Sequence, residues 1–155
     1  MFGPNSLSVQ RLVPASAEDI FALLADPAGH ALIDGSGTVQ SARSGGRRLG
    51  LGDRFGMSMR MGVPYSTLNT VIEFDDNRRI AWQTTAAGPL GFILGGRVWR
   101  YELEPVIGGT LVTETWDLRR ERMTSRPAVK AAMAHRTRTN MERTLARIET
   151  LATAA

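Results

Sequence analysis

The 155-residue sequence contains no cysteine, and its only histidines are His30 and His135. Without cysteine there are no disulfides, thiolate metal ligands or cysteine nucleophiles. Two histidines do not favour a multi-histidine metal site, so we expect neither a metal nor a cofactor. No apolar run approaches the ~20 residues that span a bilayer. The N-terminus lacks the basic and apolar regions of a signal peptide. We therefore expect a cytoplasmic protein with no integral membrane segment.

Lysine is also scarce, since Lys130 is the only one, and arginine supplies almost all of the basic charge. The formal net charge is +4. Nucleic-acid binding needs clustered basic residues, but the arginines are scattered and form only short pairs, such as Arg78-Arg79. This distribution predicts a solvated charged surface and no nucleic-acid partner.

Hydrophobic residues make up 43% of the chain and charged residues 22%, as in ordinary globular proteins. The length suits one domain, and we expect residues 1–155 to form it. Ser16 followed by Asp19 predicts a helix start, and Asp26-Pro27 ends that helix. A second short helix is expected over 28–33, with Gly35 breaking it.

In the middle of the chain apolar and polar residues alternate with period two, and Gly, Pro, Asn and Asp mark turns between these stretches. Together with an N-terminal strand, it predicts seven strands, over 6–13, 38–44, 53–61, 65–75, 79–86, 97–104 and 110–119. The last segment changes to helical spacing and predicts one long amphipathic helix that runs from about 125 to 152.

The segment 96–117 carries an unusual acid. On its first predicted strand Trp99, Tyr101 and Leu103 share one face, and on the second Glu114 and Trp116 share a face. Leu111 competes with Val112 as the inward residue, so the sequence leaves this phase open. If Glu114 faces inward, it lies on an aromatic surface, where an unpaired carboxylate is costly in a plain core. A ligand cavity can use such a group.

The chain resembles the START/Bet v 1-like (SRPBCC) helix-grip superfamily, and within it the bacterial polyketide cyclase/dehydrase-like group. The resemblance is carried by Val13-Pro14-Ala15-Ser16 with the following helix, Trp99-x-Tyr101-x-Leu103-Glu104-Pro105, Gly108-Gly109-Thr110 and the C-terminal helix. It implies an α+β fold in which a curved seven-stranded antiparallel sheet wraps around a long C-terminal helix, with two short helices after the first strand. It also implies a tunnel that holds a lipophilic molecule. Some members cyclise or dehydrate polyketides, and others only bind and carry.

Ligand-binding candidates are the large apolar residues expected to face the tunnel. Methionine adapts to varied apolar ligands, and aromatic rings offer apolar area with a polar handle. An ordinary core would use the same residues. The candidates are Phe55, Met57, Met59, Met61, Trp82, Trp99, Trp116, Met133, Thr137 and Met141.

Glu114 is the principal catalytic candidate. Burial in an apolar pocket would raise its pKa, so it could act as general acid or base in a cyclisation or dehydration. Tyr101 is a candidate proton donor. The alternative is a surface acid, or a carboxylate paired with Arg97 or Arg100.

His30 and Asp34 form a second catalytic candidate because residues four apart share a helix face. His30 could move protons while Asp34 orients it. In the alternative interpretation Asp34 caps the helix and His30 only packs. His135 falls outside the apolar arc and is expected in solvent.

The segment 88–96 places Phe92, Ile93 and Leu94 between glycines, which suggests a portal, a dimer contact or a membrane-touching tip. Three functions therefore stay open. They are a cyclase or dehydrase, a carrier of a lipophilic small molecule, and a protein- or membrane-interaction module, with a homodimer left open.

Overall fold

The computed structural model describes residues 2–3, 5–35, 39–42, 48–61, 63–86, 95–121 and 126–154. Within these ranges the sheet contains eight antiparallel strands in the order β1-β2-β8-β7-β6-β5-β4-β3. Six strands are long: β2 (Ser6–Val13), β4 (Arg54–Met61), β5 (Val63–Asp75), β6 (Arg79–Ala86), β7 (Gly95–Val106) and β8 (Gly109–Asp117). Two short strands, β1 (Phe2–Gly3) and β3 (Val39–Ala42), lie at the edges.

The predicted α+β helix-grip fold is confirmed, but the predicted count of seven strands is wrong. The structure has six long strands. The segment expected as a full strand over 38–44 forms only the four residues of β3, and the two-residue β1 was not predicted. Both are edge strands, so each is held by one neighbour only, and the register of β3 against β4 shifts between Val39 and Ser41.

Each helix begins within one residue of its predicted start. Ser16 caps α1 (Ala17–Leu24), and its hydroxyl accepts a hydrogen bond from the Asp19 backbone N–H at 3.1 Å. Asp26 caps α2 (Pro27–Ile33), whose first residue is a proline that needs no hydrogen-bond donor there. The long helix α3 covers Arg126–Ala152.

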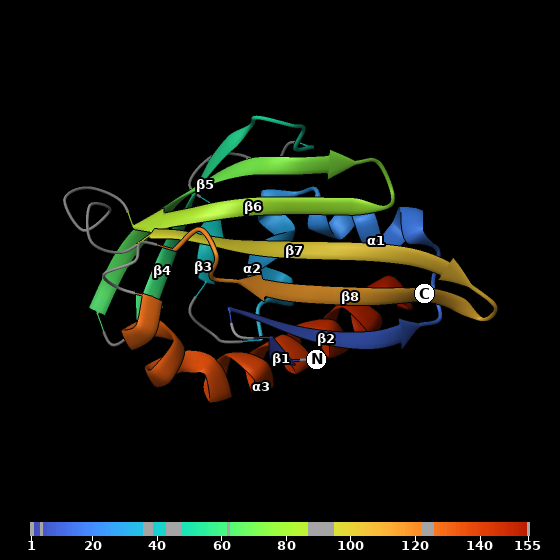
Figure 1. Ribbon diagram of the computed structural model, residues 1–155. Coiled ribbons are helices and arrows are strands. Elements are labelled where there is room, and N and C mark those ends of the chain that lie inside the picture. Colours follow the sequence, from blue (N-terminus) through green and yellow to red (C-terminus); the bar gives the residue numbers. More distant parts are fainter. Residues whose placement is uncertain are drawn as a thin grey trace.

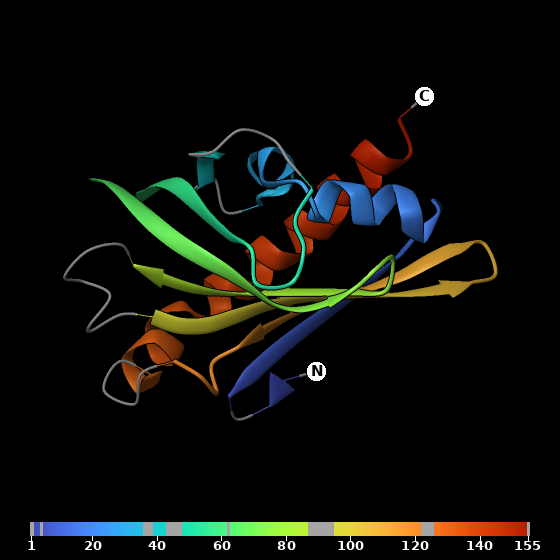
Figure 2. The ribbon, with the colours of Figure 1, turned by 90° about the horizontal axis from the view of Figure 1, so that it is seen from above.

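Figures 1 and 2 show the sheet curving around α3, with α1 and α2 packed on the same side. The core lies between these helices and the inner face of the sheet. From α3 it contains the fully buried side chains Met141, Leu145 and Ile148. The helix thus supplies one wall of the interior, and the strands supply the other.

A glycine sets the distance between α2 and α3. A Cβ atom added to Gly35 would lie 2.2 Å from the Asn140 carbonyl oxygen and 2.6 Å from the Thr144 backbone nitrogen. The Gly35 N–H instead donates to the Thr144 hydroxyl at 2.9 Å. This close approach fixes the end of α2 against α3.

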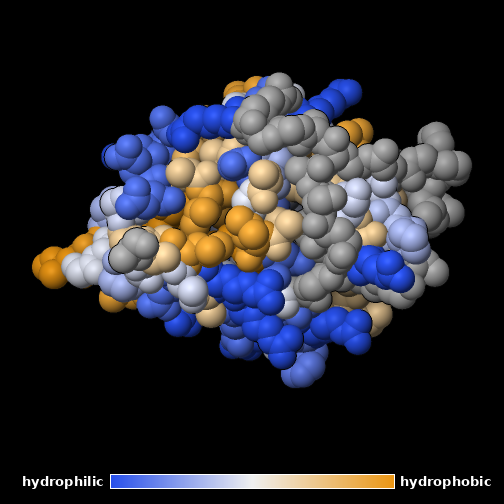
Figure 3. Space-filling model, turned by 180° about the vertical axis from the view of Figure 1, so that it is seen from behind, coloured by the Kyte–Doolittle hydropathy of each residue, from blue (hydrophilic) through white to orange (hydrophobic). Residues whose placement is uncertain are grey.

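The side of the molecule opposite to the view of Figure 1 has both apolar and polar areas. Figure 3 shows an apolar area there, bordered by hydrophilic residues. No helix in the described part of the chain combines the length and apolar character needed to cross a membrane.

Candidate functional site

The inner face of β7 and β8 carries the predicted aromatic residues and the acid. Tyr101 and Leu103 on β7 are buried, as are Val112, Glu114 and Trp116 on β8. Their period-two spacing places them on one side of the sheet. The sequence leaves open whether Leu111 or Val112 faces inward. Val112, at 0% exposure, is the inward residue, and Glu114, two residues later, therefore also points into the interior.

Glu114 is 2% exposed and forms a pair with Tyr101 from the facing strand. The Tyr101 hydroxyl donates to Glu114 Oε1 at 2.9 Å. The second carboxyl oxygen, Oε2, is buried and has no hydrogen-bond partner among the residues that the structure describes. Burial raises the pKa of Glu114 from 4.5 to about 8, opposed by the Tyr101 hydrogen bond and reinforced by the charge of Asp34. Glu114 is therefore mainly a neutral acid at pH 7.

The phenol of Tyr101 stays protonated for the same reason. Burial, and then the neighbouring Glu114, raise the pKa of Tyr101 well above 10. The alternative partners considered for Glu114 are engaged elsewhere, since Arg97 pairs with Glu121 and Arg100 pairs with Glu73 and Asp117. Glu114 is thus neither a surface acid nor part of an arginine ion pair.

Three rings connect Tyr101 to α2. Trp82 on β6 stacks on Tyr101 with ring centroids 5.6 Å apart, and His30 stacks on the same indole at 4.5 Å. Phe55 on β4 meets both His30 and Trp82 edge to face. These side chains form an aromatic layer between α2 and the sheet.

His30 is buried within this layer and does not pair with Asp34. The ring Nε2 lies 2.8 Å from the Leu24 carbonyl oxygen and donates to it. Burial lowers the pKa of His30 to about 4, so the ring is neutral near pH 7. Asp34 is the C-cap of α2, through its backbone N–H to the His30 carbonyl. The structure therefore does not bring His30 and Asp34 together as an acid–base pair.

The remaining ligand-binding candidates largely share the same interior. Trp82, Trp99 and Trp116 stand in one row across β6, β7 and β8. Met57 and Met141 are buried, while Met59, Trp99 and Met133 are partly buried against the core. Thr137 is 5% exposed on α3, and His135 on the same helix is exposed, as expected. For Met61 only the backbone is described, and Phe92, Ile93 and Leu94 lie outside the described residues.

Sequence reasoning missed a polar row beside the tryptophans. Asn69 on β5, Thr84 on β6 and Arg97 on β7 are successive partners across the sheet. The Thr84 hydroxyl donates to Asn69 Oδ1 at 2.6 Å, and Asn69 Nδ2 donates to the Phe55 carbonyl oxygen at 3.3 Å. The alternation of Thr67, Asn69 and Val71 was the available signal, but its phase depends on pairing with β6.

Arg97 ends this row in a clamp with Glu121, which follows β8. Glu121 accepts from the Gly95 N–H at 2.9 Å, and from the Arg97 N–H and Arg97 Nε at 3.1 Å each. Gly96 allows this approach, because it has φ +104° and a Cβ there would lie 1.9 Å from the Arg120 carbonyl oxygen. The clamp joins the start of β7 to the segment that leads toward α3.

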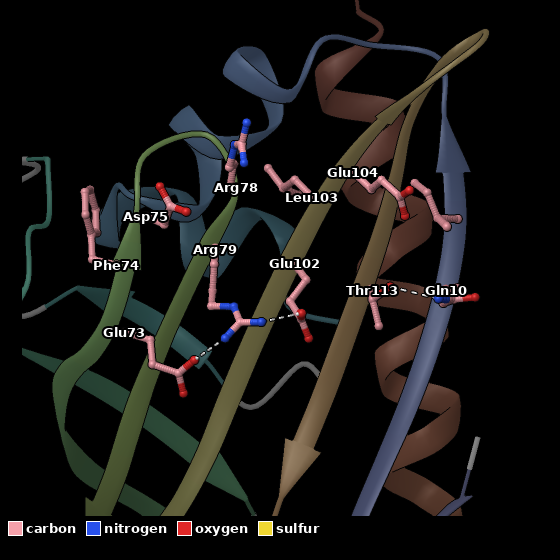
Figure 4. A pocket seen from close by; sticks show the side chains of 11 residues that line it. Gln10, Glu73, Phe74, Asp75, Arg78, Arg79, Glu102, Leu103, Glu104 and Thr113 are labelled. Carbon is pink, nitrogen blue, oxygen red and sulfur yellow. Dashed lines mark hydrogen bonds and ion pairs between the residues drawn. The ribbon is translucent and has the colours of Figure 1, made fainter.

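The outer face of the sheet is covered by ion pairs. Figure 4 shows Arg79 lying between Glu73 and Glu102, to which it donates at 3.2 and 2.8 Å. Arg100 donates to both carboxylate oxygens of Glu73 and also to Asp117 Oδ2. A pocket of about 690 Å³ on this face is lined mainly by charged residues, among them Glu73, Arg79 and Glu102. It faces away from α3 and is not the expected tunnel.

A second pocket, of about 280 Å³, lies at the β4–β5 hairpin and includes Met59 and Tyr65. Around Glu114 the interior is closed, since Glu114 is 2% and Met141 1% exposed. A ligand that reaches Glu114 must therefore separate inner-face side chains. The described residues contain no cluster of three or more His, Cys, Asp or Glu side chains that could hold a metal ion.

Residues 5–153 match the family model described as "Polyketide cyclase / dehydrase and lipid transport". The chain belongs to this family. The predicted resemblance is confirmed, and the family supports a hydrophobic ligand-binding role.

Known relatives agree on the fold and leave the chemistry open. An uncharacterized protein of Mycobacterium tuberculosis is 35% identical over 119 residues, which are 74% of this chain and 48% of that protein. The chain thus spans about half the length of the curated relatives it matches. A Chromobacterium violaceum crystal structure superposes with TM-score 0.74 at 14% identity, covering 99% of this chain and 100% of that one. Protein Ms6760 of Mycobacterium smegmatis gives 0.70 at 16%, covering 94% and 89%. Identities this low show the fold alone.

Proposed function

We propose that the protein binds a lipophilic, polyketide-like small molecule between the inner face of the sheet and α3, in the cytoplasm. The observation that carries this proposal is the buried Glu114, whose Oε2 lies in an aromatic and methionine-rich interior and has no hydrogen-bond partner in the described part of the chain. A buried polar atom without a hydrogen bond costs about 1–3 kcal/mol. A ligand oxygen placed against Oε2 would remove that cost.

The methionine side chains can make room for such a ligand to enter. Met57 and Met141 are buried and Met59 and Met133 partly buried around the interior. Methionine side chains are unbranched and change rotamer at low cost, so they can move apart around a guest. A closed interior in the empty protein is therefore compatible with binding.

The test is native mass spectrometry of the purified protein, followed by organic extraction of any bound compound. We expect a lipophilic molecule that carries at least one oxygen function. Glu114→Leu keeps the site apolar but removes the acceptor and donor, and it should reduce retention of that compound. Equal retention by wild type and Glu114→Leu would show that Glu114 does not contact the ligand.

A second candidate function is cyclase or dehydrase chemistry without a metal. It is favoured by the neutral Glu114 held by Tyr101, because a carboxylic acid with a pKa of about 8 can donate and recover a proton near neutral pH. On this proposal Glu114 is the general acid, and Tyr101 positions it. Turnover of a poly-β-keto thioester should then be lost in Glu114→Gln while binding persists. A carrier would bind the same compound and return it unchanged.

A further inference from the structure

The clamp around Glu121 lies at the end of the polar row and contains more positive than negative charge. Two guanidinium groups contact this one residue. Arg97 donates through Nε to the Glu121 carboxylate, and Arg126 donates through Nη2 to the Glu121 carbonyl oxygen at 3.1 Å. Arg119, two residues before Glu121, is bound to Asp117. The group of Arg97, Arg126 and Glu121 therefore keeps one net positive charge.

Both guanidinium groups retain unused donors. Arg97 binds Glu121 through Nε only, and its two terminal nitrogens have no hydrogen-bond partner among the described residues. The Arg97 side chain is 18% exposed, so these nitrogens are partly screened from water. Arg126 Nε is buried and likewise has no hydrogen-bond partner within the described ranges. Donors in this state favour a further anionic acceptor.

Arg97 also faces the interior. It has the same phase on β7 as Trp99 and Tyr101, and it is the sheet partner of Thr84 in the polar row. Tyr65 is half-buried, and its raised pKa reflects burial first, with Arg97 opposing and Asp34 reinforcing. Tyr65 is thus within electrostatic reach of Arg97, and it lines the pocket at the β4–β5 hairpin.

We infer that Arg97, with Arg126 beside it, forms a subsite for the carboxylate of an amphipathic ligand. The apolar part of that ligand crosses the tryptophan row at Trp99, which lies between Arg97 and Tyr101 on β7, and a second oxygen function meets Glu114. This inference rests on the proposed function and specifies its ligand. Guanidinium pairs with carboxylate through two parallel hydrogen bonds, which an alcohol cannot accept equally well.

The sheet sets the length of the ligand. Arg97 and Tyr101 are four residues apart on β7, which corresponds to about 13 Å along a strand. The carboxylate and the inner oxygen function should be separated by roughly this distance. A chain of about ten carbons or a set of fused rings meets that requirement.

The experiment compares dodecanoate with dodecan-1-ol as probes of equal chain length. The three tryptophans of the chain stand in the proposed binding region, so intrinsic fluorescence reports occupancy. Wild type should bind dodecanoate roughly tenfold or more tightly, as expected for a charge-assisted bond. Arg97→Gln should bind both probes with the affinity of the alcohol, and Arg97→Lys should fall between. Arg79→Gln, on the outer face, is the matched control and should behave as wild type.

The outcomes separate the two proposals. Equal affinity of wild type for both probes would overturn the carboxylate subsite and leave lipophile binding standing. A preference for dodecanoate that survives in Arg97→Gln would overturn the assignment to Arg97. Binding of neither probe would overturn the subsite and count against the proposed function as well. If Arg97→Gln fails to fold, the wild-type comparison and Arg97→Lys still decide.

Discussion

Glu114 and His30 show how burial changes the chemistry of single residues. Burial raises the pKa of Glu114 to about 8 and lowers the pKa of His30 to about 4. Both groups are therefore mainly neutral at pH 7, the acid protonated and the imidazole unprotonated. Each of these two proton-transfer candidates is therefore an uncharged group in the interior near pH 7.

Glu114→Gln should remove a pH dependence of the free energy of unfolding. The folded protein binds a proton that the unfolded chain has lost above pH 4.5, so wild-type stability should fall as pH rises from 4.5 to about 8. The slope is at most about 1.4 kcal/mol per pH unit. The glutamine amide cannot ionise, so the stability of the variant relative to wild type should increase as pH rises. Urea unfolding at pH 5, 7 and 9 measures the difference. A constant difference would show that Glu114 does not titrate abnormally.

His30→Phe should gain stability relative to wild type as pH falls, whereas Glu114→Gln gains it as pH rises. The folded pKa of about 4 lies below the ordinary 6.5, so His30 contributes stability above pH 6.5 that is lost as pH falls toward 4. Between pH 7 and pH 5, wild type should lose about 2 kcal/mol relative to the variant. The measurement is the unfolding free energy at both pH values. Replacing the exposed His135 by glutamine is the control and should leave the wild-type dependence intact.

At the scale of elements, α2 and α3 are held in contact by the small size of Gly35. The sequence predicts that Gly35 breaks the second helix, and α2 does end at Ile33, just before it; in addition, Gly35 leaves room for the close packing against α3. The sequence alone does not reveal this, because Asn140 and Thr144 are more than one hundred residues away.

Gly35→Ala should therefore destabilise the protein by about 1–3 kcal/mol or more, because the added methyl group has no space beside Asn140. Gly50→Ala is the matched control, since its Cβ would meet Asp53 at an ordinary 3.7 Å. Thermal unfolding of both variants gives the comparison. Similar melting temperatures for the two variants would contradict the packing argument.

On the outer face of the sheet, two arginines that pair with carboxylates differ in their exposure to solvent. Arg100 is 14% exposed and joins Glu73 on β5 to Asp117 on β8, whereas Arg79 is 47% exposed. Although burial alone would raise it, the pKa of Asp117 falls to about 2 because Arg119 and Arg100 donate hydrogen bonds to it. This carboxylate therefore contributes stability above pH 3.8 that is lost as pH falls toward 2.

We expect Arg100→Gln to cost about 1.5–3 kcal/mol, because partly buried carboxylates lose charged donors. Arg79→Gln should cost less than about 1 kcal/mol, as for other exposed pairs. Denaturant midpoints at neutral pH measure both. An equal loss of stability in Arg79→Gln and Arg100→Gln would contradict this expectation.

At the scale of the whole molecule, α3 closes the interior that the sheet leaves open. Its buried residues meet side chains from the sheet and from α1 and α2. The folded sheet and the helix therefore depend on each other, and the ligand proposed here would bind between them.

Leu145→Ala should destabilise the whole protein by about 2–5 kcal/mol, because Leu145 is 1% exposed and the change leaves a cavity. Leu151→Ala should lower the free energy of unfolding by less than about 1 kcal/mol, because Leu151 lies on the same helix but is 37% exposed. Tryptophan fluorescence and circular dichroism should report one common transition in both variants. Separate transitions for helix and sheet would show that α3 does not close the core cooperatively.

Local patterns in the sequence determined the elements and the family. The Ser16 cap, the period-two strands and the terminal helix are set by neighbouring residues, and the structure has them all, with one strand short and one added. Whether Glu114 points inward, and what it meets there, depended on the pairing of β8 with β7. The same holds for the Arg97–Glu121 clamp and for Gly35. Burial, proton affinity and close packing arise from residues far apart in the chain, so only the tertiary structure decided them.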